Sequence, residues 1–317
     1  MVQRECAVAS VEGLGIQIVI SIVMLTYNRE NLVRRAIESV LSQTFKDFEY
    51  IIIDNGSDDH SGEIADTYAA LDSRLCVIHK ERGNIGSGRN AGLDAAAGEY
   101  ITFIDDDDFC QPDYLSFLYQ LITENNADMS ICGAADKAFD EKRIMAAEEA
   151  LIELMWRKKY NVAFPAKLFK ASLFNGIRFS ETSKYDDIEL MPQIIGKSKR
   201  VAYHGLPKYT FERHASNNSA WTTNHKLLDA ATLDEYLSVY RSRTEWLIAT
   251  FPKNAMSWKY FEWSFMLSMV EKVTRLKLTH CDFQRTAMIR ELQAHREEFL
   301  CSGLVLDFEK EWVLLYV

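Results

Sequence analysis

Four consecutive carboxylates, Asp105, Asp106, Asp107 and Asp108, directly follow the apolar run at residues 100–104. A buried strand that ends in carboxylates places oxygen atoms at the carboxyl edge of a sheet, where open α/β sheets bind their ligands. Four neighbouring like charges repel one another unless a cation is bound. Because Mg²⁺ and Mn²⁺ prefer oxygen ligands and can bridge carboxylates to phosphates, the acidic run predicts a metal–diphosphate site. The alternative interpretation is a solvated acidic loop.

Polar clusters also follow two other predicted strands, which cover residues 18–25 and 48–53. The residues of these clusters that concern the site are Thr26, Tyr27, Asn28, Asp54 and Asn55. The carboxyl ends of parallel strands meet at one edge of a sheet, so we expect both clusters to lie near the acidic run. We also expect Asn28 to cap the helix that follows it.

A further pair of acids, Asp186 and Asp187, precedes an apolar stretch at residues 188–195 that predicts a helix. Negative charge is favoured at the N-terminus of a helix, where the helix dipole keeps a carboxylate ionised. The alternative role for Asp187 is to cap this predicted helix.

The spacing of apolar residues alternates between strand and helix over the first 132 residues. It predicts strands at residues 18–25, 48–53, 75–79, 100–104 and 129–132, and helices at 30–43, 61–71, 89–97 and 112–125. A glycine-rich turn is expected at 83–88. This alternation predicts an α/β fold with a doubly wound, mostly parallel, Rossmann-like sheet. Residues 226–317 predict a helical extension, which divides the chain into a leader (1–17), a main domain (18–225) and a helical region (226–317).

Composition narrows the class of partner and the compartment. The 317 residues carry a net charge of −10, which argues against a nucleic-acid partner bound through its phosphates. The six cysteines have no metal-ligand spacing, so we expect reduced thiols and a cytoplasmic protein. No apolar run reaches the roughly 18 residues that a membrane span needs. Peripheral contact with the inner face of the membrane and a homodimer both stay open.

Taken together, four blocks of the sequence resemble the bacterial family 2 glycosyltransferases of GT-A fold. They are SIVMLTYNRE, SQTFKDFEYIIIDNGSDD, GSGRNAGLDAAAGEYITFIDDDD and KYDDIEL. The resemblance covers residues 18–219 and implies a metal-dependent, inverting transfer of one sugar from a nucleotide-diphosphate sugar. A UDP-sugar is the expected donor, and a cell-surface glycan or a lipid-linked saccharide is the expected acceptor.

The resemblance also implies roles for individual residues. Nucleotide-sugar contacts are implied for Thr26, Tyr27, Asn28, Asp54, Asn55, Arg89, Asn90, Asp105, Asp106 and Arg213. Asp105 and Asp107 match the D-x-D metal motif, Asp108 is the acid that follows it, and His214 is a further candidate ligand for Mn²⁺ or Mg²⁺. A solvated loop is the alternative for Arg213 and His214. Asp187 matches the catalytic base, and Asp186, where Glu is usual, replaces it if the register shifts by one.

Three positions depart from the family pattern. Leu25 replaces a proline, Asp106 replaces a serine, and Asn55 replaces an aspartate that would accept the uracil N–H. An asparagine carbonyl can accept the same hydrogen bond, so a thymidine-linked donor stays open beside the UDP-sugar. Two other functions also stay open: a nucleotidyltransferase, and a catalytically inactive carbohydrate-binding assembly subunit.

Overall fold

The computed structural model describes residues 18–135, 138–214, 222 and 224–317. The chain divides into two compact units, Met1–Glu212 and Arg213–Val317. The expected leader, residues 1–17, lies outside the described residues.

A mixed sheet of nine strands forms the centre of the described part of the first unit, in the order β3-β2-β1-β4-β8-β6-β9-β5 with β7 paired to β9. The strands are β1 (Ile20–Thr26), β2 (Phe48–Asp54), β3 (Leu75–His79), β4 (Tyr100–Asp105), β5 (Phe109–Cys110), β6 (Met129–Ala134), β7 (Lys142–Met145), β8 (Lys167–Lys170) and β9 (Val201–Thr210). β1 to β4 are parallel neighbours, and β6 pairs in parallel with β9. β8 is antiparallel to both β4 and β6, so the sheet is mostly parallel, as the sequence predicts.

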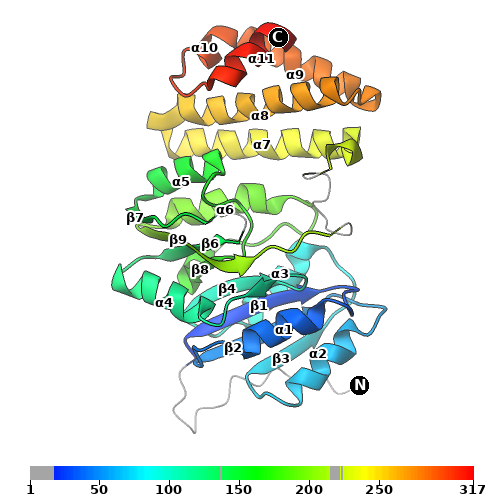
Figure 1. Cartoon of the computed structure of the whole chain (residues 1–317), viewed down its shortest axis with the longest axis vertical. Coiled ribbons are helices and arrows are strands. Elements are labelled where there is room, and N and C mark those ends of the chain that lie inside the picture. Colours follow the sequence, from blue (N-terminus) through cyan, green and yellow to red (C-terminus); the bar gives the residue numbers. More distant parts are fainter. Residues whose placement is uncertain (1–17, 136–137, 215–221, 223) are drawn as a thin grey trace. The chain divides into compact units, whose positions relative to one another are not determined.

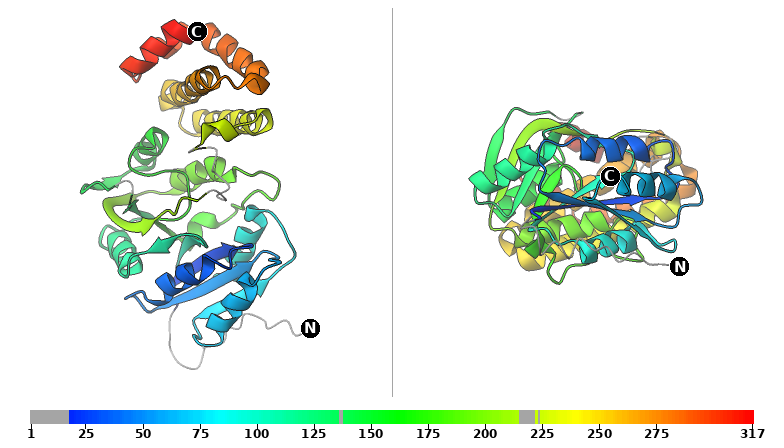
Figure 2. Two further views of the ribbon diagram at one scale, coloured as in Figure 1. Left: turned by 45° about the vertical axis from the view of Figure 1, so that its right-hand side comes forward. Right: turned by 90° about the horizontal axis from the view of Figure 1, so that it is seen from below.

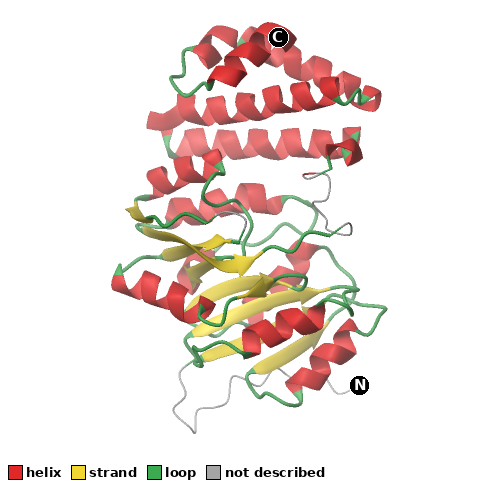
Figure 3. Cartoon of the chain, viewed as in Figure 1, coloured by secondary structure: helices red, strands yellow, loops and turns green. Residues whose placement is uncertain are grey.

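Helices cover both faces of this sheet (Figures 1 and 3). They are α1 (Val33–Leu41), α2 (Ser61–Ala69), α3 (Ile85–Ala95), α4 (Tyr114–Glu124), α5 (Ala147–Trp156) and α6 (Asp186–Lys197). Figure 1 shows α1 and α2 on one face of the β1–β3 region and α3 on the other. Right-handed crossovers require this, because the strand order reverses between β3 and β4.

Buried, mostly apolar side chains of the strands form the core of this unit. Ile20, Ile22, Met24, Tyr50 and Ile52 are completely buried, as the unbroken apolar runs of a parallel sheet require when helices cover both faces.

The expected glycine turn at residues 83–88 is wrong, because α3 already begins at Ile85. Asn84 caps this helix, its side-chain carbonyl accepting the Ser87 N–H at 2.8 Å. A side chain at Gly86 would lie 2.0 Å from the Ser180 carbonyl oxygen, and one at Gly88 2.5 Å from Leu25. The glycines therefore allow close approach of α3 to its neighbours, which local sequence patterns do not distinguish from a turn.

The expected cap by Asn28 is also wrong. α1 begins at Val33, five residues later, and Asn28 has a left-handed backbone conformation with φ of 53°. Its side-chain carbonyl accepts the Asp58 N–H at 2.8 Å. Asn28 thus connects the loop after β1 to the loop after β2 instead of starting a helix.

The second unit is helical (Figure 2). Its longer helices are α7 (Ala230–Thr250), α8 (Ala255–Arg275), α9 (Asp282–Ala294) and α11 (Asp307–Tyr316), with the short α10 (Arg296–Leu300) between the last two. α8 packs against all four of the others. It carries several aromatic side chains, of which Trp258 and Tyr260 are buried, and the ring of Phe265 stacks on that of Tyr240 with centroids 3.9 Å apart.

Among the described residues, no helix is both long and apolar enough to span a membrane. Cys110, Cys132, Cys281 and Cys301 are free thiols, as expected, whereas Cys76 is disulfide-bonded, contrary to the expectation of reduced thiols throughout.

Candidate active site at the carboxyl edge of the sheet

The acidic run forms a compact group of oxygen atoms where β4 ends. One carboxylate oxygen from each of Asp105, Asp107 and Asp108 lies within 4.8 Å of the others. Asp107 is 9% exposed and Asp108 3% exposed. This arrangement excludes a fully solvated acidic loop and confirms that the residues after β4 gather at one point.

Tyr209 on β9 holds the two ends of this group together. Its hydroxyl donates to Asp108 Oδ2 at 2.8 Å and accepts the Asp105 N–H at 3.2 Å. The Glu212 N–H donates to the other Asp108 oxygen at 2.8 Å. Asp108 is therefore oriented by two hydrogen bonds from the end of β9.

Asp106 points toward the end of β1. Its Oδ2 accepts the Tyr27 N–H at 3.3 Å, and its Oδ1 lies 3.7 Å from Arg29 Nε. Adjacent acids in the run therefore have different neighbours, and Asp106 joins the predicted nucleotide-binding cluster after β1.

Burial shifts the proton affinities of these acids. It raises the pKa of Asp108 to about 8, with further increases from the Asp105 and Asp107 charges. It raises the pKa of Asp106 to about 7, where the Asp107 charge adds to the effect. The pKa of Asp105 rises to about 6, again mainly through burial, and Arg89 opposes that rise.

Arg89 on α3 packs against a pair of mutually contacting aromatic rings next to the acidic run. Its guanidinium carbon lies 5.3 Å from the ring centroids of both Phe164 and Phe179, and Arg89 Nη2 lies 3.7 Å from Asp105 Oδ1. Aromatic faces attract a cation and restrict its rotation. The rings thereby present a fixed positive charge beside the carboxylates.

Asp187 belongs to the same electrostatic group. Burial raises the pKa of Asp187, while the positive charges of Arg89 and then Arg157 lower it. The Asp187 charge in turn raises the pKa of Asp105. The fold thus brings the first turn of α6 to the acidic run, which lies about 80 residues earlier in the chain.

Asn90 has a different environment from that expected for a direct nucleotide-sugar contact. Its amide nitrogen donates to the Phe179 carbonyl oxygen at 3.0 Å, and its carbonyl oxygen accepts the Phe179 N–H at 2.9 Å. Asn90 therefore fixes the backbone of one of the two rings that hold Arg89.

Asp54 ends β2 in a chain of polar contacts. Its Oδ1 accepts the Ser57 N–H at 3.0 Å, and its Oδ2 lies 2.9 Å from His79 Nδ1. The other His79 nitrogen lies 3.0 Å from Asp66. Two carboxylates therefore share one imidazole ring, which orients Asp54.

Asn55 binds the loop that precedes α3. Its side-chain carbonyl accepts from Lys80 Nζ at 3.1 Å and from the Gly83 N–H at 3.3 Å. Its amide nitrogen donates to the Gly83 carbonyl oxygen at 2.8 Å. The Asn55 side-chain carbonyl, which we expected to accept a hydrogen bond from a base, thus already accepts two hydrogen bonds within the protein.

Several of these supporting residues carry no motif of their own. Tyr209, His79, Phe164 and Phe179 lie in ordinary apolar or mixed segments, and only the order of the strands brings them to the site. No spacing in the sequence indicates that Phe164 and Phe179 pair beside Arg89. Arg213 and His214 belong to the second unit and stay predictions.

Comparison with known proteins decides the family. Residues 21–183 match the model of glycosyl transferase family 2, which is about half of the chain. The chain belongs to this family.

Two curated relatives of this family member come from Streptococcus pneumoniae and Staphylococcus aureus. Glycosyltransferase GlyA of Streptococcus pneumoniae is 28% identical over 75% of this chain. This chain spans only 39% of the length of GlyA. The poly(ribitol-phosphate) β-N-acetylglucosaminyltransferase TarP of Staphylococcus aureus is 30% identical, and the match covers 69% of each protein.

Two solved structures confirm the GT-A fold of the glycosyltransferase. TarS of S. aureus (residues 1–349), in complex with UDP-GlcNAc, matches with a TM-score of 0.60 at 17% identity, over 90% of this chain and 89% of that one. The mannosyltransferase PcManGT of Pyrobaculum calidifontis, in complex with GDP-Man and Mn²⁺, matches with a TM-score of 0.58 at 13% identity. That match covers 95% of this chain and 84% of the other.

The carboxylates of this glycosyltransferase fit a divalent metal ion. Three carboxylate oxygens from Asp105, Asp107 and Asp108 converge, which is the hard-oxygen ligand set that Mg²⁺ and Mn²⁺ prefer. Burial raises the pKa values of Asp105 and Asp108, so keeping these carboxylates ionised costs free energy that a bound cation offsets.

Proposed function

We propose that this protein transfers a single sugar from a nucleotide-diphosphate sugar to an acceptor hydroxyl, with inversion at the anomeric carbon and with a divalent metal ion as cofactor. The observation that carries the proposal is the position of Arg89. Its charge acts on both Asp105, at the end of β4, and Asp187, at the start of α6. One cation, 3.7 Å from Asp105, thereby acts on both a candidate metal ligand and the candidate base.

Asp105 and Asp107, with Asp108 beside them, would hold the metal ion. When bound, Mn²⁺ or Mg²⁺ supplies positive charge that offsets the charge developing on the leaving diphosphate. Tyr209 and the Glu212 N–H orient Asp108, which limits how far the ligand oxygens can move apart. Because carboxylates bind a metal ion only when deprotonated, the protein binds the metal most strongly when Asp105, Asp107 and Asp108 are all ionised.

Asp187 is the proposed general base. A carboxylate in this role removes the proton of the acceptor hydroxyl while that oxygen attacks the anomeric carbon from the face opposite the diphosphate. Burial raises the pKa of Asp187 toward the range in which a base is effective, and Arg89 keeps the ionised form accessible. A single displacement of this kind needs no covalent sugar–enzyme intermediate.

Arg89 has a second task in this proposal. Its guanidinium, fixed by Phe164 and Phe179, gives a positive charge that does not have to reorganise as the diphosphate leaves. Asn90 contributes indirectly, because it holds the backbone of Phe179.

The loops after β1 and β2 are the proposed nucleotide site. Thr26, Tyr27 and Asn28 follow β1, and Asp54 and Asn55 follow β2, so all five lie along the carboxyl edge. The bond between Asn28 and Asp58 joins the two loops. A UDP-sugar is the proposed donor, a proposal that the UDP-GlcNAc bound to TarS supports.

The proposed acceptor is a hydroxyl of a cell-surface glycan or of a lipid-linked saccharide. The names of two relatives support this class. TarP is described as acting on poly(ribitol-phosphate), and a Campylobacter jejuni relative is described as acting on an undecaprenol-linked saccharide.

A donor panel tests the proposal. UDP-, GDP- and dTDP-sugars are incubated with the protein, with Mn²⁺ or with EDTA, and release of nucleoside diphosphate is measured. We expect release with one base and with metal only. Once an acceptor has been found, NMR of the glycosylated acceptor should show the anomeric configuration opposite to that of the donor. Retention of configuration, or equal turnover in EDTA, would contradict the proposal.

A further inference from the structure

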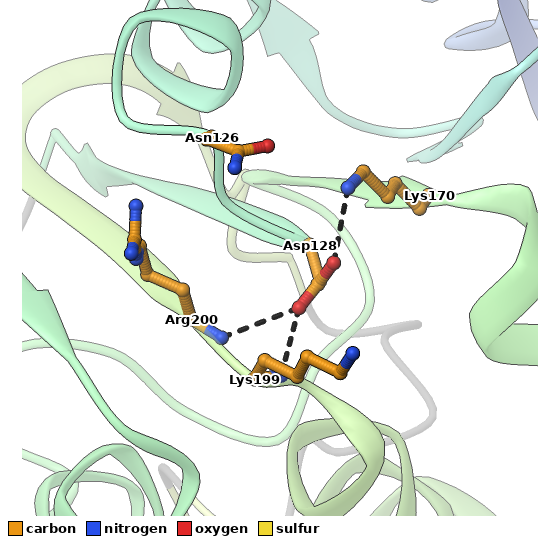
Figure 4. A pocket seen from close by; sticks show the side chains of 5 residues that line it. All are labelled: Asn126, Asp128, Lys170, Lys199 and Arg200. Atoms are coloured by element: carbon orange, nitrogen blue, oxygen red, sulfur yellow. Dashed lines mark hydrogen bonds and ion pairs between the residues drawn. The ribbon is translucent and has the colours of Figure 1, made fainter.

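A basic hollow lies at the edge of the sheet opposite the candidate active site. It has a volume of about 320 Å³ and is lined by Asn126, Asp128, Lys170, Lys199 and Arg200 (Figure 4). Nothing in the proposed transfer reaction uses these residues.

The strand directions establish the position of this hollow. β4 and β6 are both antiparallel to β8 and so run in the same direction, and β9 is parallel to β6. Asp128 and Arg200 directly precede β6 and β9, so they lie at the amino edge, whereas Asp105 ends β4 at the carboxyl edge. A strand of six residues separates the two edges by roughly 20 Å. A diphosphate bound at the acidic run therefore does not reach the hollow.

Asp128 organises the basic residues. Its carboxylate binds Lys170 Nζ at 3.0 Å and accepts the N–H groups of Lys199 at 2.7 Å and Arg200 at 3.3 Å (Figure 4). Its backbone N–H donates to the Arg200 carbonyl oxygen, and its backbone carbonyl oxygen accepts the Lys170 N–H, both at 2.9 Å. The ammonium group of Lys170 and the backbone N–H groups of Lys199 and Arg200 are thus held around one acid.

One carboxylate does not balance this charge. Asp128 pairs with Lys170, and among the described residues no carboxylate lies within ion-pair distance of Lys199 or Arg200. Arg200 Nη1 donates to the Asn125 carbonyl oxygen at 2.6 Å, which orients the guanidinium without neutralising it. The lining side chains carry a net charge of +2, in a protein whose net charge is −10.

These groups match the chemistry of a phosphate group. A guanidinium and an ammonium ion are the side chains that bind phosphate oxygens most strongly, and they donate charge-assisted hydrogen bonds. A phosphate dianion would balance the excess charge of the hollow. Asn126 has a left-handed backbone with φ of 44°, and its amide group adds a neutral donor at the rim.

We propose that Asn126, Lys199 and Arg200, organised by Asp128 and Lys170, form a phosphate-binding site at the amino edge of the sheet. Its ligand is a phosphate group other than the donor diphosphate. A small phosphate compound and the headgroup of an anionic phospholipid can both supply that group.

The test is an NMR titration of the full chain with inorganic phosphate, in EDTA at low ionic strength. The reporters are the backbone amides of Lys199 and Arg200, which bond directly to Asp128. We expect their signals to shift and to saturate, while chloride at matched ionic strength gives no saturation. Lys199→Ala and Arg200→Ala should each weaken the affinity about tenfold, the loss expected for one charge-assisted hydrogen bond.

Lys197→Ala is the matched control. Lys197 belongs to the same basic segment and is exposed, but its Nζ donates to the Asn175 carbonyl oxygen at 2.7 Å and does not line the hollow. It removes the same charge, so an unchanged affinity in this variant separates a specific site from general attraction. Lys199→Ala should also keep its melting temperature and its donor hydrolysis, because Lys199 Nζ has no partner among the described residues.

Vesicle flotation identifies the source of the phosphate. Binding to phosphatidylglycerol vesicles but not phosphatidylcholine vesicles, lost in Lys199→Ala and kept in Lys197→Ala, assigns the site to a lipid headgroup. Saturable phosphate binding without such vesicle binding assigns it to a small phosphate compound. The proposal is overturned if neither ligand binds, or if Lys197→Ala weakens binding as much as Lys199→Ala does.

Discussion

The hydroxyl of Tyr209 donates a hydrogen bond of 2.8 Å to Asp108 although the two residues are 101 positions apart in the chain. The same hydroxyl accepts the Asp105 N–H, so one side chain of β9 links both ends of the acidic run. The loop after β4 therefore takes its shape from β9, which is not a neighbour of β4 but pairs with β5, the strand that follows the loop.

Tyr209→Phe should weaken both the fold and metal binding. The variant keeps the buried ring but leaves an Asp108 oxygen without its donor, which costs about 1–3 kcal/mol of unfolding free energy. We expect a lower urea midpoint and a weaker Mn²⁺ affinity by isothermal titration calorimetry. Tyr119→Phe is the control, because that tyrosine packs on Phe45 away from the acidic run. Unchanged Mn²⁺ affinity in Tyr209→Phe would show that Tyr209 does not orient a metal ligand.

Asp107→Ala should abolish sugar transfer and reduce the metal-dependent binding of nucleoside diphosphate. It removes one of three converging carboxylates, and two remaining acids hold a divalent cation less strongly. The measurement is nucleoside diphosphate affinity with Mn²⁺ and with EDTA. Asp307→Ala is the control for lost negative charge, since its side chain is 95% exposed and lies at the start of α11. If Asp107→Ala binds nucleotide with the same metal dependence as the wild type, the acidic run is not the metal site.

Asp187→Asn should leave donor binding nearly intact and reduce turnover by about 10²–10⁴-fold, the usual contribution of a general base. Asparagine has nearly the same shape but cannot take a proton. Single-turnover rates and donor affinity are measured together, so that binding and chemistry are separated.

Glu189→Gln, two residues further along α6, is the matched control for Asp187→Asn. The cap that the sequence offered as the alternative for Asp187 is wrong, because the N-cap position of α6 is Tyr185; the competing role is a structural one in the first turn of the helix. Near-normal turnover in Asp187→Asn would identify such a structural role and exclude a base.

His79 should make the stability of the protein depend on pH. Burial lowers the pKa of His79, but its hydrogen bonds to Asp54 and Asp66 outweigh that effect and raise the pKa. A pKa that is raised in the folded state adds stability below the unfolded value of about 6.5, and this stability is lost as pH rises through the folded pKa. The wild type should therefore lose more stability than His79→Gln between about pH 6 and pH 8.

Urea midpoints at a series of pH values measure the His79 effect. His280→Gln is the control, because His280 lies 2.9 Å from a backbone carbonyl oxygen, that of Leu228, instead of a carboxylate. Parallel pH profiles for the wild type and His79→Gln would show that the contacts with Asp54 and Asp66 contribute nothing to stability.

Local patterns in the sequence determine the elements and the acids of the site. β2, β3 and β4 lie within one residue of their predicted bounds, because unbroken apolar runs report burial on both faces of a parallel sheet. The acidic run identifies the candidate metal site from sequence alone, because residues that directly follow a strand must lie at its carboxyl end. The glycines of α3 were misinterpreted, since a glycine that permits close packing has the same local pattern as one in a turn.

The tertiary structure alone decides which side chains complete the site. β5 follows the acidic run and pairs with β9, so the fold of the sheet brings Tyr209 to the run; the tertiary structure also packs Phe164 and Phe179 against Arg89. It also brings Lys170, Lys199 and Arg200 together around Asp128. The physical reason is that periodicity reports only whether each residue faces the core. Contacts between residues a hundred positions apart depend on strand order and register, which the packing of the whole sheet selects.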